Sequence, residues 1–192
     1  MTLLFIFFGC PEPIVYQLDA VQPPDPKHMI RIVDDTHRQQ FFWIDAFEYP
    51  NVPNQRPVAN TSFTDAQQSC QEVGKRLCTA QEWRRACLGS EGLRFGYGES
   101  YESNRCHTAS TLSSGHTSMM HAQEYVVESG SKQHCQSEGV FDLIGNVEEW
   151  VLDDWQGRPG SLEGGAWYTY TEYADCSGMY SRQPDYRTPL VR

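Results

Sequence analysis

The stretch Gly139-Val-Phe-Asp-Leu-Ile-Gly-Asn-Val-Glu-Glu-Trp150 is the most informative part of this 192-residue chain. It combines a Gly-Asn turn, acidic residues on both sides of that turn, and a tryptophan of the kind that proteins bury. Two further segments combine glycine with tryptophan: Gly74-Lys-Arg-Leu-Cys-Thr-Ala-Gln-Glu-Trp83 precedes this stretch, and Gly164-Gly-Ala-Trp167 follows it.

These three segments, in this order, resemble the formylglycine-generating enzyme family, also called the sulfatase-modifying factor family. Phe42-Trp-Ile-Asp45 and Tyr97-Gly98 match shorter family motifs, so the resemblance extends from about Phe42 to the end of the chain. It implies an α+β fold related to C-type lectins. Such a domain has two helices, short twisted sheets and much irregular loop, stabilised by disulfides and calcium.

Composition limits the classes of partner. The chain is 39% hydrophobic, which is typical of a globular domain, and its formal net charge is -10. Such a charge repels a phosphate backbone, so we expect no nucleic-acid partner. Acidity suits either solubility or cation binding.

Local patterns predict where the helices lie. Ser62-Phe-Thr-Asp65 and Thr79-Ala-Gln-Glu82 have the form of capping boxes, and Gly74 and Gly89 can end the helices that follow. The predicted apolar faces are Phe63, Ala66, Cys70 and Val73 in the first helix, and Trp83, Ala86 and Cys87 in the second.

Strands are predicted where β-branched and aromatic residues concentrate, at Ile30–Val33, Gln40–Phe47 and Gly164–Tyr173. From Ser90 to Glu138 the composition predicts a long irregular stretch, which is either functional or held by cross-links.

The resemblance implies a calcium site in the Gly139–Trp150 stretch. Carried over by position, Asp142 and Glu149 supply side-chain oxygens, whereas Gly145 and Val147 supply main-chain carbonyls. Calcium prefers six to eight hard oxygen ligands, and this set provides both charge and carbonyls. The alternative is that Asp142 and Glu149 are ordinary exposed acids on a turn.

A second family calcium site begins at the position of Asn104. Its other ligands should come from a segment before Gly139, and the corresponding residues Ser129–Cys135 contain no acid. The sequence therefore offers only a weak second site.

Catalytic members of the family oxidise a substrate cysteine with copper that is held by two thiolates. Thiolates are soft ligands and suit copper(I). The corresponding positions here are Thr169 and Ala174, and neither residue can bind copper as a thiolate. Cys176 is nearby but is a single thiol. The resemblance therefore predicts a non-catalytic domain without copper. The alternative is an oxidase or related redox enzyme with a rearranged site.

Seven cysteines without a CxxC pair favour disulfides in an oxidising compartment over a zinc site. The resemblance implies a Cys87–Cys176 bridge, and Cys106 with Cys135 would clamp the long irregular stretch. The usual partner of Cys70 lies in a closing strand, so we expect this sequence to lack its last strand and to leave Cys70 and Cys78 unpaired. Residues alone leave the pairing open.

The N-terminus suggests export. Leu3–Phe8 is apolar and is followed by Gly9-Cys10, which resembles the end of a bacterial lipoprotein signal with Cys10 as the lipidated residue. The alternative is a hydrophobic first strand. Residues 11–27 are rich in proline and predict an extended tether, so the folded domain is expected over residues 28–192.

We therefore expect a calcium-stabilised binding module, anchored by lipid to a bacterial cell envelope, whose ligand is an envelope protein, a peptide or a glycan. Its candidate contact residues are Tyr97, Tyr101, Trp155 and Trp167, although tryptophans are more often core residues. Copper handling by His116 and His121 is a third hypothesis, and a polar loop that contains these residues by chance is the simpler account.

Overall fold

The computed structural model describes residues 27–34, 40–111, 122–153, 160–170, 173–177 and 179–181. Cys10, the proline-rich tether before Lys27, the pair His116 and His121, and Trp155 lie outside these ranges. Within the described residues, no helix is long and apolar enough to cross a membrane.

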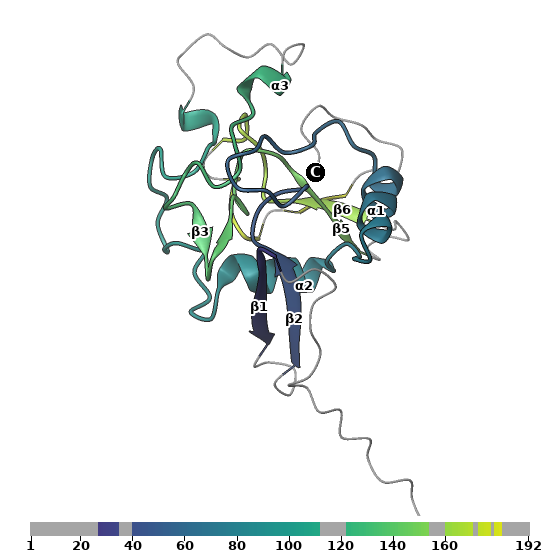
Figure 1. Ribbon diagram of the computed structural model, residues 1–192. Helices are drawn as coiled ribbons and strands as arrows, with labels where there is room; N and C mark the ends of the chain where they lie inside the picture. Colours follow the sequence, from purple (N-terminus) through teal and green to yellow (C-terminus); the bar gives the residue numbers. More distant parts are fainter. Residues whose placement is uncertain are drawn as a thin grey trace, which may run out of the picture.

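The chain begins with a two-stranded antiparallel ribbon of β1 (Met29–Asp34) and β2 (Gln40–Asp45), which projects from the body of the domain (Figure 1). Ile30 pairs with Ile44 and Ile32 with Phe42, and Ile32 and Ile44 are buried in the main core. The two predicted strands are therefore confirmed, although the second ends at Asp45.

Helices α1 (Phe63–Glu72) and α2 (Ala80–Leu88) begin where the capping residues predict. The Ser62 hydroxyl accepts from the Asp65 N–H at 3.2 Å, and the second capping box is complete, with Thr79 and Glu82 bonded in both directions. Gly74 and Gly89 have φ of +72° and +66°, as predicted for the residues that end the helices.

The apolar faces of the two helices are confirmed except at one position. Trp83, Ala86 and Cys87 of α2 are buried in the main core, whereas Phe63 and Ala66 of α1 pack in a smaller cluster with Trp150 and Leu162. Val73, predicted on the apolar face of the first helix, is 48% exposed because it caps the helix instead of continuing it.

Two further sheets complete the α+β architecture. β3 (Gln136–Ser137) and β4 (Val140–Phe141) form a short hairpin, and β5 (Glu149–Leu152), β6 (Gly160–Glu163) and β7 (Met179–Ser181) form an antiparallel sheet in that order. The long stretch before β3 contains only the 3-10 helix η2 (Ala109–Thr111) and the short helix α3 (Ala122–Tyr125) among its described residues.

The strand predicted over Gly164–Tyr173 is wrong. β6 ends at Glu163, because Gly164 and Gly165 take φ of +82° and +69°, outside the range of a strand. A side chain at Gly164 would also lie 2.4 Å from the Leu143 carbonyl oxygen. The two glycines therefore bring the chain round in a turn against the Gly139–Trp150 stretch.

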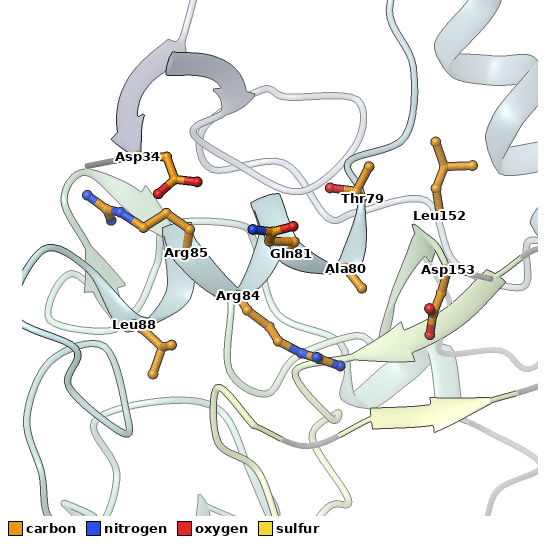
Figure 2. A pocket seen from close by; sticks show the side chains of 9 residues that line it. All are labelled: Asp34, Thr79, Ala80, Gln81, Arg84, Arg85, Leu88, Leu152 and Asp153. Atoms are coloured by element: carbon orange, nitrogen blue, oxygen red, sulfur yellow. The ribbon is translucent and has the colours of Figure 1, made fainter. Parts of the chain in front are cut away.

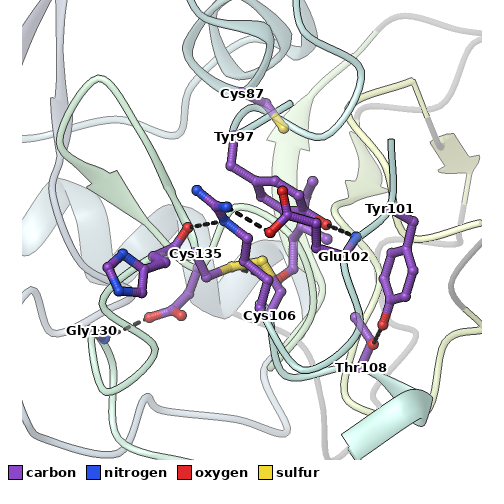
Figure 3. Close-up of a disulfide and its surroundings, with 12 residues drawn as sticks. Cys87, Tyr97, Tyr101, Glu102, Cys106, Thr108, Gly130 and Cys135 are labelled. Atoms are coloured by element: carbon purple, nitrogen blue, oxygen red, sulfur yellow. Dashed lines mark hydrogen bonds and ion pairs between the residues drawn. A yellow bond between two sulfur atoms is a disulfide. The ribbon is translucent and has the colours of Figure 1, made fainter. Parts of the chain in front are cut away.

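The structure contains the two disulfides that were expected. Cys87 of α2 is bonded to Cys176. Cys106 is bonded to Cys135 (Figure 3), which closes the long irregular stretch. All four residues are buried. Cys70 and Cys78 lie outside these two bridges, in the wall of an apolar groove of about 670 Å³ between β2 and α1.

Candidate functional site

The Gly139–Trp150 stretch contains β4, a buried turn and the start of β5. Residues 142–150 are all buried, and Asp142, Gly145 and Asn146 have φ of +55°, +82° and +51°. Asp142 and Glu149 are only 1% and 6% exposed. The alternative that these two residues are exposed surface acids is therefore wrong.

Each of the two carboxylates is held by a donor from a distant part of the chain. Asp142 Oδ2 accepts from the Gly130 N–H at 2.6 Å, the bond drawn from Gly130 in Figure 3. Glu149 Oε2 accepts from the Trp83 Nε1–H of α2, also at 2.6 Å. These charge-assisted bonds fix the orientation of both side chains before any ligand binds.

The main chain of the turn presents further oxygens. Between described residues, no hydrogen bond ends on the carbonyl oxygen of Gly145 or Val147. The intervening Asn146, by contrast, accepts from Trp167 N–H through its carbonyl at 3.1 Å. Two main-chain oxygens on alternate residues are thus available as ligands.

This donor set fits calcium by its chemistry. It consists of hard oxygens from two buried carboxylates and two main-chain carbonyls, which are the ligand types that calcium prefers. No cluster of three or more acidic, histidine or cysteine side chains suited to a metal occurs among the described residues. Calcium at this turn would therefore complete its shell with carbonyls and water.

Asn104, the predicted start of a second calcium site, lies in an unfavourable place. It has φ of +64° and lines a shallow groove of about 420 Å³ together with Arg105 and Lys132. The Arg105 guanidinium bonds Glu102 at 2.7 Å and the His134 carbonyl at 2.9 Å. Two cationic side chains oppose a second cation here.

The positions that correspond to the copper thiolates hold no sulfur. The Thr169 hydroxyl oxygen accepts from Ala166 N–H at 2.9 Å inside a tight turn, and the Ala174 methyl group is fully buried. Cys176 is bonded to Cys87 in a bridge whose residues are both 0% exposed. The residues present therefore do not fit copper held by two thiolates.

Two exposed tyrosines flank these positions and were missed from the sequence. Tyr170 is 72% exposed and Tyr173 is 57% exposed, the two largest exposures among the large apolar and aromatic residues described. The expected strand concealed them, since a strand would have buried alternate rings. The predicted contact Trp167 is instead a fully buried core residue, and Tyr97 and Tyr101 are half-buried.

A cleft of about 610 Å³ lies between α2, the end of β1 and the end of β5 (Figure 2). Arg84 points from α2 toward the sheet, where it forms an ion pair with buried Glu163 at 2.9 Å. Burial raises the pKa of Glu163 to about 7, and Arg84 offsets only part of this effect. No sequence pattern pointed to this buried acid.

Comparison with known proteins gives a family match. A family model described as the sulfatase-modifying factor enzyme 1-like domain matches residues 29–191. The inactive C-alpha-formylglycine-generating enzyme 2 of Bos taurus is 28% identical over 115 residues, which cover 58% of this chain and 38% of that protein. The chain thus matches well under half the length of this relative.

The chain is also similar to proteins of known structure, one of which shares its fold. Treponema denticola variable protein 1 superposes with a TM-score of 0.57 at 18% identity, covering 71% of this chain and 69% of that chain. PvdO from Pseudomonas aeruginosa gives a TM-score of 0.49 at 18% identity, over 78% of this chain and 65% of that one. At such identities the likeness to the treponemal protein concerns the fold alone.

Proposed function

The chain belongs to the sulfatase-modifying factor enzyme 1-like domain family, and we propose that its domain is a non-catalytic, calcium-stabilised binding module of an exported lipoprotein. The name of the cattle relative, an inactive formylglycine-generating enzyme, agrees with a domain that keeps the fold without the oxidation.

The observation that carries this proposal is the absence of sulfur at two positions. Thr169 and Ala174 occupy the places of the copper thiolates, and Thr169 uses its hydroxyl to stabilise a turn. A rearranged oxidase would need a pair of accessible thiols near Cys176. The sulfur of Cys176 is instead bonded to Cys87, and both residues are fully buried.

A copper(I) titration tests this point. We expect the double variant Thr169→Cys/Ala174→Cys to bind one more copper(I) than the unmodified chain, since it restores two thiolates in one loop. Comparing the two proteins removes the contribution of Cys70 and Cys78, which both contain. Equal copper(I) stoichiometry in the two proteins would contradict the assignment of these positions.

Calcium would be held by Asp142, Glu149 and the carbonyls of Gly145 and Val147. When bound, it would neutralise two buried carboxylates and tie the turn between β4 and β5 to α2 through Glu149 and Trp83. We expect chelation to lower the melting temperature, and Asp142→Ala, which removes the side-chain oxygens, to remove this dependence on calcium. A melting temperature that chelators leave unchanged would argue against the calcium site.

We place ligand binding on the surface that carries Tyr170 and Tyr173. Exposed tyrosines offer a rigid apolar ring with a polar end, which suits peptides and glycans. The test is a screen of glycan and peptide arrays, followed by Tyr170→Ala/Tyr173→Ala. The control is Val52→Ala/Val58→Ala, which truncates two residues that are 41% and 45% exposed. Equal effects of both double variants would contradict this surface.

Export with a lipid on Cys10 is the last part of the proposal. Two disulfides support an oxidising compartment, and Leu3–Phe8 before Gly9-Cys10 supports a lipoprotein signal. The intact mass of the protein from a bacterial envelope should show a diacylglycerol adduct on Cys10 that Cys10→Ser abolishes. A mass that begins at unmodified Met1 would contradict it.

A further inference from the structure

A buried carboxyl group is bonded to the middle of the turn that carries the proposed calcium ligands. Glu48 follows β2 and is 0% exposed. Its Oε2 accepts two hydrogen bonds, from the Ser129 hydroxyl at 2.6 Å and from Asn146 Nδ2 at 2.7 Å. The second bond joins residues 98 positions apart in the sequence.

Asn146 is the residue that Glu48 holds, and it lies between the two proposed carbonyl ligands. Its side chain bonds the main chain of Val127 in both directions, at 3.0 and 3.2 Å. Its N–H donates to the His107 carbonyl at 2.8 Å, and its own carbonyl accepts from Trp167 N–H at 3.1 Å. Every polar group of Asn146 is thus engaged with protein.

These bonds also maintain an unusual backbone. Asn146 has φ of +51°, and Gly145 before it has φ of +82°. Asparagine enters this region more readily than most non-glycine residues, and the bonds of Asn146 fix it in this conformation. The main-chain N–H and carbonyl of Asn146 are both bonded to protein. The carbonyls of its neighbours Gly145 and Val147, by contrast, accept no hydrogen bond from another described residue.

The geometry points to Glu48 as a positioning residue for calcium. Its carboxyl group fixes the Asn146 side chain, and Asn146 fixes the conformation in which Gly145 and Val147 offer their carbonyls. Glu48 therefore acts on the two carbonyls through its bond to Asn146. This inference rests on the proposed calcium site, and it assigns to Glu48 a share of the affinity of that site for calcium. Partners beyond the ligands of a metal commonly contribute 10–100-fold in affinity.

The test measures metal affinity separately from stability. Trp83 donates to Glu149, so excitation of this indole should sensitise the luminescence of terbium bound in place of calcium. Calcium is then titrated as a competitor in the full 192-residue chain. Glu48→Gln keeps the side-chain volume but loses the carboxylate, and we expect it to weaken calcium binding by about 10-fold or more.

Ser129→Ala is the matched control. It removes the other hydrogen bond of Glu48 and leaves the bond to Asn146 in place. We expect its calcium affinity to stay within about threefold of the unmodified chain. Ser129→Ala loses one buried hydrogen bond, and Glu48→Gln exchanges charge-assisted bonds for weaker neutral ones, so both variants should melt at lower temperature. A merely structural Glu48 would instead leave the affinity of Glu48→Gln unchanged, and that result would overturn the inference.

Two outcomes keep the test decisive. If Glu48→Gln does not fold, Glu48→Asp keeps a carboxylate and withdraws it by one methylene. It should then bind calcium more weakly than Ser129→Ala, and equal affinity would overturn the inference. If the unmodified chain binds neither terbium nor calcium, the proposed calcium function fails and this inference fails with it. If the unmodified chain and the Glu48 variants bind calcium with the same affinity, the inference about Glu48 is wrong while the proposed calcium site stands.

Discussion

At Gly145 the backbone takes φ of +82°, and a Cβ atom would lie 2.3 Å from the His107 carbonyl oxygen. Gly145→Ala must therefore both strain the backbone and displace a neighbouring main chain. We expect a loss of about 2–5 kcal/mol in the free energy of unfolding, measured by denaturant titration with a chelator present.

Gly92→Ala is the control for the backbone contribution alone. Gly92 has φ of +72°, and nothing lies within 4 Å of its hypothetical Cβ atom. It should lose only about 1 kcal/mol. Equal losses at the two glycines would show that the close approach to His107 contributes nothing.

Glu163 should make stability depend on pH. Burial raises its pKa to about 7, above the ordinary value of 4.5, so the folded state holds the proton more tightly than the unfolded state. The stability associated with this group is present at acid pH and is lost as pH rises from about 4.5 through 7. The shift corresponds to roughly 3 kcal/mol at most.

Glu163→Gln should remove this dependence. His107, whose pKa is lowered by burial, gives the opposite slope, with stability rising toward pH 6.5, and it is present in both proteins. The unfolding free energy of Glu163→Gln minus that of the unmodified chain, both measured at fixed calcium, should therefore increase from pH 5 to pH 8. A difference that is constant with pH would contradict the raised pKa.

Residue identities were easier to predict than residue surroundings. The motif placed Asp142, Glu149 and the turn correctly in one stretch, because those residues are close in sequence. The hydrogen-bond partners of the residues in this stretch were not predictable. Trp83 lies 66 positions from Glu149, and Glu48 lies 98 positions from Asn146. Such contacts depend on tertiary packing and leave no local pattern.

At the scale of the element, the capping box of α2 makes a measurable contribution. The Thr79 hydroxyl oxygen accepts from Glu82 N–H at 3.1 Å, and Glu82 Oε2 accepts from Thr79 N–H at 2.8 Å. Thr79→Ala should therefore cost about 1 kcal/mol in thermal or denaturant unfolding. Thr64→Ala, at an exposed position of α1, should change stability by less than about 0.5 kcal/mol in either direction.

Helices and strands differed in how well the sequence predicted them. The limits of α1 and α2 depend on local signals, namely a cap hydroxyl, a carboxylate three residues later and a glycine. The strand expected over Gly164–Tyr173 was wrong because aromatic content favoured it, whereas Gly164 and Gly165 take positive φ values where they pack against Leu143 and Thr169, respectively. The exposed Tyr170 and Tyr173 were missed for the same reason.

At the scale of the whole molecule, the two disulfides should contribute unequally. Cys87 and Cys176 are 89 positions apart, and Cys106 and Cys135 are 29 apart. In the chain-entropy account the longer loop is worth about 4.5 kcal/mol and the shorter about 3.5 kcal/mol. Denaturant unfolding of Cys87→Ala/Cys176→Ala and Cys106→Ala/Cys135→Ala should follow this order. The reverse order would show that packing around the buried sulfurs outweighs loop closure.

The central claim is that this domain retains the family fold while lacking the family's oxidation. Its most direct test incubates the full chain with copper, oxygen and a cysteine-containing sulfatase peptide, and follows the peptide by mass spectrometry. A formylglycine-generating enzyme known to be active serves as the positive control. We expect the peptide mass to remain unchanged, since Thr169 and Ala174 supply no thiolate. Conversion of the peptide cysteine to formylglycine by this chain would contradict the account.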